Sequence, residues 1–193
     1  MRVLALVISC FCCQSILAQD KARAWYVPDV YKVQLAGNIG FVSVGAGFIH
    51  ARDKMETDLY IGYLPERIGG DDIFTLTAKT TFMPWKWPLN DKYDLVPFAT
   101  GFYLSYSFGS QFDTILPNEY PDGYYWWASS LRFGGFIGGN ITMTLPANSK
   151  IKSVALYYEL GTYDLIFLSY MQNIDYLDIT DVVSLSLGIK VAL

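Results

Sequence analysis

The 193-residue chain is acidic, hydrophobic and rich in aromatic residues. Its formal net charge is −4, 52% of its residues are hydrophobic and 17% are aromatic. Its basic side chains are scattered rather than gathered in a patch, which argues against a nucleic-acid partner. The length corresponds to one domain.

Residues 1–18 have the pattern of a cleaved secretory signal peptide. Arg2 supplies the positive charge, and the apolar run at 3–13 is too short to span a bilayer. Ala18 is a small residue at the expected cleavage point, and cleavage one residue later is an alternative. A lipoprotein signal ending before Cys10 is disfavoured, because its apolar core would be very short.

All three cysteines of the chain, Cys10, Cys12 and Cys13, fall inside this segment. We therefore expect a mature chain without disulfides, cysteine nucleophiles or cysteine-bound metals. The mature net charge is about −5, since the segment removes one basic residue and no acidic residue.

Residues 19–38 are expected to form a lead-in segment before the main domain. Tyr31, Val33 and Leu35 alternate with other side chains, so one short strand is an interpretation of this region. The residues at 36–38 indicate a turn, and a kink within one long strand is the alternative.

Eight segments after residue 38 are expected to be strands, and most of them alternate apolar with small or polar residues. The expected strands are 41–49, 56–64, 72–83, 95–107, 129–139, 151–160, 165–171 and 181–193. The last one alternates without a break to Leu193, and its second face is too small to form a core. The segment 165–171 is apolar on both faces, and Val96 is expected to face outward.

An exported chain with this alternation is either a soluble β-sandwich or a closed barrel in an outer membrane. After the first segment, no apolar run approaches the ~20 residues that a membrane helix needs. Aromatic residues cluster at the predicted strand ends, as expected for girdles at the lipid headgroups. The residues expected in these girdles are Trp85, Trp87, Tyr106, Trp126, Trp127 and Tyr170.

The fold that we predict is all-β: a closed, antiparallel, up-and-down transmembrane barrel of eight strands within residues 39–193. Counting back from the C-terminus places the connections 65–71 and 108–123 on the periplasmic side. Periplasmic turns of such barrels are normally short. Either the long second connection folds against the barrel mouth, or this strand count is wrong.

The pattern of nearly the whole mature chain resembles the small eight-stranded outer-membrane barrels of bacteria. These include the OmpA transmembrane domain, the OmpX and OmpW types and the lipid A deacylase PagL. The ending at 188–193 (G-I-K-V-A-L) resembles the strand that the barrel assembly machinery recognises, although Leu193 stands where that signal usually has Phe. The resemblance implies the outer membrane of a Gram-negative bacterium, with outer-membrane lipid, lipopolysaccharide and the assembly machinery as partners.

A deacylase of the PagL type would need a histidine, a serine and a glutamate within hydrogen-bond reach. The single histidine, His50, ends the first expected strand. Ser169, Ser184 and Ser186 lie in late segments without a histidine beside them, and Glu159 faces inward nearer the opposite mouth. His50 is therefore a weak catalytic candidate and is more simply explained as a polar residue at a loop edge. We expect no cofactor, and the acidic clusters lack the spacing of a calcium loop.

The inward-facing charges are expected to form a polar network that fills the lumen. Asp58 and Lys79 flank one turn at similar distances, so they should lie close together across a hairpin. Glu159 and Lys190 are expected near the periplasmic mouth, and Arg132 at mid-strand. Unpaired buried ions are costly, and an eight-stranded barrel is about the size that side chains fill.

The function that these patterns favour is a non-enzymatic outer-membrane barrel with a structural or surface-interaction role. One alternative is a hydrolase of lipid A or phospholipid acyl esters, supported by fold analogy alone. Another is a conduit for small hydrophobic solutes of the OmpW type, which would need a wide lumen or a lateral opening.

Overall fold

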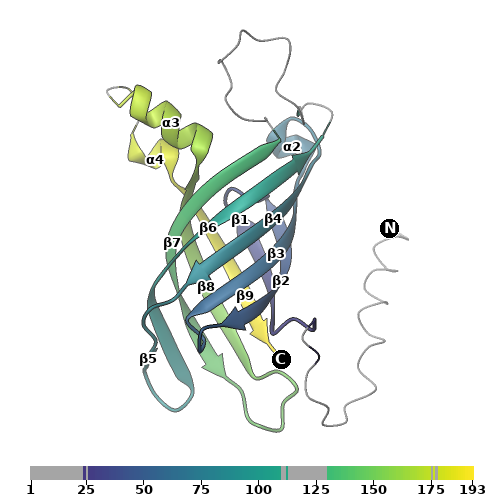
Figure 1. Cartoon of the computed structure of the whole chain (residues 1–193), viewed down its shortest axis with the longest axis vertical. Coiled ribbons are helices and arrows are strands. Elements are labelled where there is room, and N and C mark those ends of the chain that lie inside the picture. Colours follow the sequence, from purple (N-terminus) through teal and green to yellow (C-terminus); the bar gives the residue numbers. More distant parts are fainter. Residues whose placement is uncertain (1–23, 25, 110–111, 113–129, 175, 177) are drawn as a thin grey trace, which may run out of the picture.

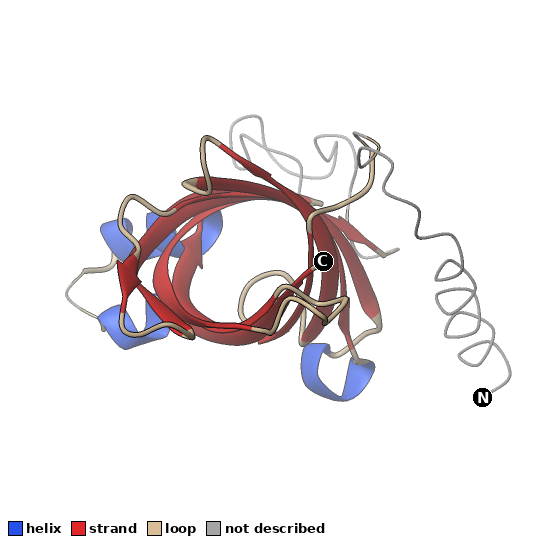
Figure 2. Ribbon diagram, turned by 90° about the horizontal axis from the view of Figure 1, so that it is seen from below, coloured by secondary structure: helices blue, strands red, loops and turns tan. Residues whose placement is uncertain are grey.

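The computed structural model describes residues 24, 26–109, 112, 130–174, 176 and 178–193. In these residues the chain forms a closed antiparallel barrel of eight strands (Figure 1). Seen from below, the strands form a continuous ring (Figure 2). The expected signal peptide at 1–18, together with Trp126 and Trp127, lies outside the described residues.

The wall is an up-and-down meander, in which strands that follow one another in the chain pair side by side. β4 pairs with β6 and β1 pairs with β9, so the sheet has no free edge in the wall. A two-residue strand, β5 (Trp87–Pro88), adds only to the margin of β6. The wall strands are β1 (Val30–Ala36), β2 (Val42–His50), β3 (Met55–Leu64), β4 (Ile73–Phe82), β6 (Tyr93–Phe108), β7 (Leu131–Thr144), β8 (Ser153–Tyr163) and β9 (Ser184–Ala192).

The expected class and number of strands are confirmed, but one of the eight expected strands was wrong and one wall strand was missed. The stretch expected as a lead-in contains β1, in which Val33 pairs with Val44 on one side and Ile189 on the other. The strand expected at 165–171 lies instead in a helix, α3 (Asp164–Gln172). Its run of consecutive apolar residues has no alternation that would orient a strand, and a helix satisfies its own backbone hydrogen bonds.

With β1 in the wall and 165–171 in a helix, each connection before α3 lies at the end of the barrel opposite to the expected one. The end that carries Leu193 is called the C-terminal end here, and the opposite one the loop end (Figure 1). The connections at the C-terminal end are 51–54, 83–92 and 145–152. Those at the loop end are 37–41, 65–72, 109–130 and 164–183. The expectation that the long connection after residue 108 shares an end with the C-terminus was therefore wrong.

Short helices occupy two of the loop-end connections: α2 (Glu66–Gly69) in the first, and α3 with α4 (Ile179–Val182) in the second. Among the described helices, none is long and apolar enough to cross a membrane. The α2 connection is held by Asp72, which accepts a hydrogen bond from the Tyr63 hydroxyl at 2.7 Å and from the Glu66 N–H at 2.9 Å. These two bonds stabilise the carboxylate, so they lower the pKa of Asp72.

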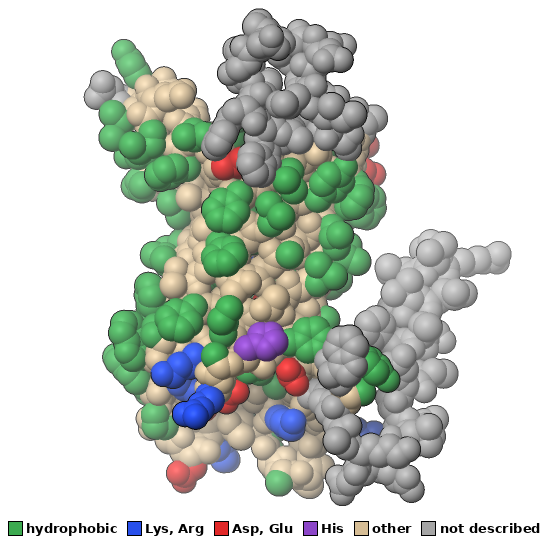
Figure 3. All heavy atoms as spheres, in the orientation of Figure 1, with side chains coloured by type: hydrophobic (Ala, Val, Ile, Leu, Met, Phe, Trp, Pro, Cys, Tyr) green, Lys and Arg blue, Asp and Glu red, His purple; other side chains and the backbone are tan. Residues whose placement is uncertain are grey.

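The alternation along each strand separates an apolar outer surface from a polar interior. In β3, the outward Leu59 and Ile61 are 56% and 59% exposed, whereas the inward Asp58 is 2% exposed. Large apolar side chains cover the outside of the wall in the view of Figure 3. A soluble barrel places its large apolar residues inside, so this arrangement is inverted.

One side chain of β6 faces the opposite way from the alternation expected of it. Val96 is buried inside the barrel, although the period from Phe98 to Phe108 predicts that it faces outward. The pairing of β6 with β7 shifts register between Val96 and Ala99. Pro97 lies in this shift and has no N–H to donate, as is typical of a bulge.

The position of β1 in the wall can be tested by cross-linking. In a chain whose three native cysteines are replaced by serine, Val33→Cys and Ile189→Cys occupy paired positions of β1 and β9. Oxidation or a short bifunctional thiol reagent should join them, which a faster-migrating band on a gel would report.

The matched control combines Val33→Cys with Leu104→Cys on β6, which lies across the ring from β1. If residues 19–38 were a lead-in outside the barrel, the Val33–Ile189 pair would cross-link no better than this control.

Candidate functional site

Three lysines and three carboxylates face the barrel interior and neutralise one another. Four of them form a group named here the Glu56 cluster. Lys32 Nζ lies 2.6 Å from Glu56 Oε2 and 2.7 Å from Asp58 Oδ2. Lys190 Nζ donates to the other Glu56 oxygen at 2.5 Å. The Glu56 carboxylate thus lies between two cations that come from opposite sides of the β1–β9 seam.

The third lysine, Lys79, forms a second ion pair with Glu159 across the lumen. Its Nζ lies 2.6 Å and 2.5 Å from the two oxygens of Glu159, so both oxygens accept from it. The same ammonium group lies 4.5 Å from the ring centre of Phe136, a cation–π distance. Lys79 is only 2% exposed, so this charge is stable only because its partners replace the water that it lost.

Gln34 and two tyrosines extend the Lys79–Glu159 pair into a wider hydrogen-bonded group. The Gln34 amide oxygen accepts from Lys79 Nζ at 3.2 Å and from the Tyr157 hydroxyl at 3.3 Å. The hydroxyls of Tyr157 and Tyr60 lie 3.3 Å apart. The polar groups therefore cross the lumen from one wall to the other rather than lining it separately.

Four inward aromatic rings fill the remaining space, and each packs over a glycine on a neighbouring strand. A Cβ atom at Gly45, for example, would lie 2.6 Å from the Tyr60 ring, which is too close. The same pairing recurs at three other places in the wall, so glycines on the inner face make room for bulky neighbours. The ring–glycine pairs are Tyr60–Gly45, Phe136–Gly101, Tyr103–Gly134 and Tyr157–Gly188.

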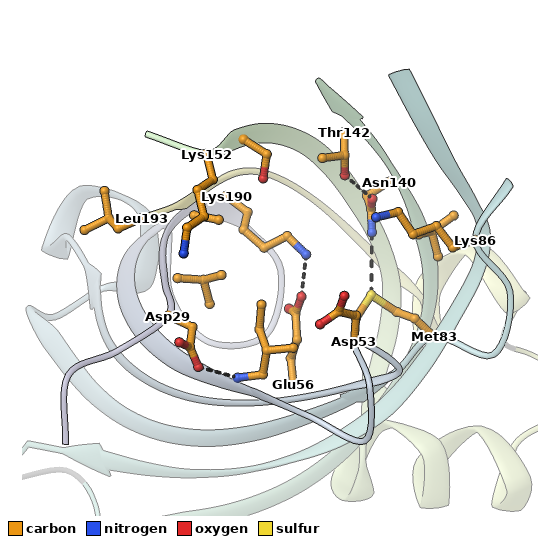
Figure 4. Close-up of a pocket in the computed structure, with 15 residues that line it drawn as sticks. Asp29, Asp53, Glu56, Met83, Lys86, Asn140, Thr142, Lys152, Lys190 and Leu193 are labelled. Atoms are coloured by element: carbon orange, nitrogen blue, oxygen red, sulfur yellow. Dashed lines mark hydrogen bonds and ion pairs between the residues drawn. The ribbon is translucent and has the colours of Figure 1, made fainter. Parts of the chain in front are cut away.

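The network divides the interior into two vestibules. The vestibule at the C-terminal end has a volume of about 420 Å³, and Figure 4 shows the Lys190–Glu56 contact among the side chains that line it. The vestibule at the loop end has a volume of about 550 Å³ and has apolar walls that include Leu64, Ile68 and Leu165. Between them, two cavities lined by the described residues measure about 20 Å³ each. Each has room for about one water molecule.

The five charges expected in the network are distributed differently from the prediction. Asp58 and Lys79 are register partners across the hairpin, as expected, but each forms its ion pair with another residue. Glu159 and Lys190 do not pair with each other, since Lys79 and Glu56 are their partners. Arg132 is the second residue of β7, so the expected mid-strand position was wrong. It lines the loop-end vestibule and donates to the Leu131 carbonyl at 3.1 Å.

Lys32 and Gln34 are two members of the network that were not predicted from the sequence. Both lie on β1, the strand that was assigned to the lead-in segment. The available signal was their alternation with Tyr31, Val33 and Leu35, which places them on one polar face. Glu56 lies on the same face of β3 as Asp58, but its partner Lys32 could not be named while β1 was left out of the barrel.

The residues considered for hydrolysis do not come together in the described part of the chain. His50 ends β2 at the C-terminal end and is exposed on the outside of the wall (Figure 3). Ser169 is exposed on α3 at the loop end. Ser186 and Glu159 lie inside the barrel, where the Ser186 hydroxyl donates to the Glu159 carbonyl and the Glu159 carboxylate pairs with Lys79.

The described girdle residues lie at both ends of the barrel. Trp85 and Trp87 are exposed near the C-terminal end, whereas Tyr106 on β6 and Tyr170 on α3 lie at the loop end. A row of further rings crosses three neighbouring strands at the loop end, because register pairing joins Tyr63 to Phe74 and Phe74 to Phe108. The other ring contacts at these ends include Tyr106 with Phe108 at 4.8 Å and Trp85 with Phe98 at 6.1 Å.

The described residues contain no group of three or more histidine, cysteine or acidic side chains arranged to hold a metal ion. No known protein-family model matches the chain, and no curated protein matches its sequence. The arrangement that remains is a neutral ion-pair network that holds opposite walls together.

The buried Lys79–Glu159 pair should stabilise the barrel only while both partners are present. Lys79→Met leaves the Glu159 carboxylate buried without its cation, so we expect a loss of about 3–5 kcal/mol in the free energy of unfolding. Lys79→Met combined with Glu159→Met removes both charges and should restore most of this loss. Urea unfolding of the barrel measures these changes.

The exposed Lys86–Asp94 pair, at 3.1 Å, provides the matched control. Lys86→Met should cost no more than about 1 kcal/mol, because water screens that pair. A Lys79→Met variant as stable as Lys86→Met would contradict the stabilising role of the interior pair.

Proposed function

We propose that the chain is a non-enzymatic integral barrel of a Gram-negative outer membrane, with a filled lumen and a structural or surface-interaction role. The observation that carries the proposal is the inverted distribution of polarity. The outer wall is apolar, and the interior holds a balanced set of buried charges. In water, the apolar outer wall of such a barrel would be exposed to solvent, whereas the acyl chains of a membrane would match its polarity.

The two ends of the barrel also support this proposal. Aromatic side chains occur near both ends of the wall, where two membrane interfaces would lie. The two longest connections, 109–130 and 164–183, lie at the loop end, and all three connections at the C-terminal end are shorter than these. Outer-membrane barrels carry long loops outside the cell and short turns in the periplasm. The loop end would therefore be the extracellular one.

The two alternative functions have less support from the geometry. A conduit for apolar solutes could begin at the loop-end vestibule, but the ion-pair network lies directly below it. An acyl-ester hydrolase would need a nucleophile and a base in hydrogen-bond reach. Among the described residues, His50 has neither a serine nor a carboxylate as a hydrogen-bond partner.

A charged substitution on the outer wall distinguishes lipid from water around the barrel. Leu59 lies in the middle of β3 and is 56% exposed. In phosphatidylcholine vesicles, Leu59→Arg should lower the free energy of unfolding by about 2–4 kcal/mol, the cost of a cation near the bilayer midplane. A urea titration followed by tryptophan fluorescence measures this change in the free energy of unfolding.

The control for this experiment is Asn148→Arg in the exposed turn between β7 and β8, which should change stability by less than about 0.5 kcal/mol. A soluble barrel would tolerate both substitutions equally, because each would place the guanidinium in water. Equal stability of the two variants would thus contradict the membrane proposal.

Closure of the lumen predicts that the protein does not conduct ions. In planar bilayers the natural chain should show no large, steady single-channel conductance. Lys79→Ala combined with Glu159→Ala removes the ion pair between the vestibules without changing the net charge, so steady conductance steps should appear. Large steady steps from the natural chain would contradict the filled-lumen part of the proposal.

A further inference from the structure

The connection between β8 and β9, residues 164–183, is named here the α3–α4 arm. It contains α3, the following turn and α4. No residue of α3, all of which the structure describes, is buried. Four consecutive apolar residues, 165–168, point to every side of one helical turn, because successive residues are about 100° apart. The helix therefore has no continuous polar face to turn toward water.

The apolar character continues beyond α3 into the rest of the arm. Met171 is 57% exposed, Ile179 is 60% exposed and Tyr176 is 90% exposed. α4 is nevertheless a formed element, since Asp178 and Asp181 make a reciprocal capping box at its start. A helix that is apolar on all sides is normally buried, and a large exposed apolar patch indicates an interaction surface.

The surface next to the arm indicates what covers the arm. Leu160 on β8 and Leu185 on β9 are cross-strand partners that face outward, and the arm lies directly between them in the chain. Figure 1 shows α3 and α4 projecting to the side of the wall at the loop end. In Figure 3, apolar side chains cover the arm and continue down the wall on the same side. The arm thus continues the surface that the proposed function assigns to lipid.

We infer that the α3–α4 arm is embedded in the lipid leaflet at the loop end, beside the barrel, as a second membrane-contacting element. This inference rests on the proposed function. A protein partner usually covers one apolar stripe of a helix and leaves a polar stripe in water. The turn at 165–168 has no such polar stripe: Leu165 and Ile166 line the loop-end vestibule, and the exposed Phe167 and Leu168 leave apolar surface that acyl chains can cover. Asp164 begins α3, and Asp178 and Asp181 lie at the start of α4, so the described charges of the arm gather at helix starts, where headgroups and water would meet them.

Spin labelling can test where the arm lies. The three native cysteines are replaced by serine, and a nitroxide is attached at Phe167→Cys or Met171→Cys. Leu156→Cys on the outer wall and Asn148→Cys in the turn at 145–152 serve as lipid and water references. In phosphatidylcholine vesicles, collisions of each label with oxygen, which enriches in lipid, are compared with those of a water-soluble nickel chelate.

The arm labels should show a high oxygen-to-nickel ratio in the range of the Leu156 label and well above that of the Asn148 label. A ratio like that of Asn148, with Leu156 still high, would place the arm in water and overturn the inference. Protection from both reagents would mean that protein covers the arm, either a partner or a second copy, and would overturn it as well. A low ratio at Leu156 would instead contradict the proposed function itself.

Discussion

The cost of removing charge from water is the constraint on which the rest of this structure depends. Six ionic side chains lie inside a narrow barrel, and each of them would be strongly unfavourable alone. They are tolerated because they are balanced in number and because each contacts a partner of opposite sign. The partners come from different strands, so the network forms only when the barrel has closed. Closure and charge neutralisation therefore depend on each other.

The size of an eight-stranded barrel explains the rest of the interior. Such a barrel has room for side chains but not for a wide channel. Large rings on one strand lie over glycines on the next, and Gln34 with two tyrosines extends the Lys79–Glu159 pair. The remaining central cavities are small, and the larger spaces lie at the two mouths. Any binding specificity is thus confined to the mouths, the loops and the outer surface.

The sequence predicted the barrel and its polar interior because side-chain alternation is a local property. Along β3 and β4 each residue is placed on the correct face by its neighbours alone. The choice of ionic partners was not local: Lys79 meets Glu159 across the lumen, which depends on strand tilt and closure. Because β1 was assigned to the lead-in segment, Lys32 was not predicted as a member of the network. The strand wrongly expected at 165–171 placed the connections before it at the wrong ends of the barrel. The run at 165–168 was misread because an apolar stretch without alternation fits a short strand or a helix equally.

The central claim is that this barrel resides in an outer membrane, with its apolar wall in lipid. The most direct measurement expresses the full chain in a Gram-negative host, separates the two membranes on a sucrose gradient and washes them with urea. The account predicts that the protein sediments with the outer membrane, resists urea extraction and migrates faster on a gel before boiling than after. Recovery of a folded barrel in the soluble periplasmic fraction would contradict it.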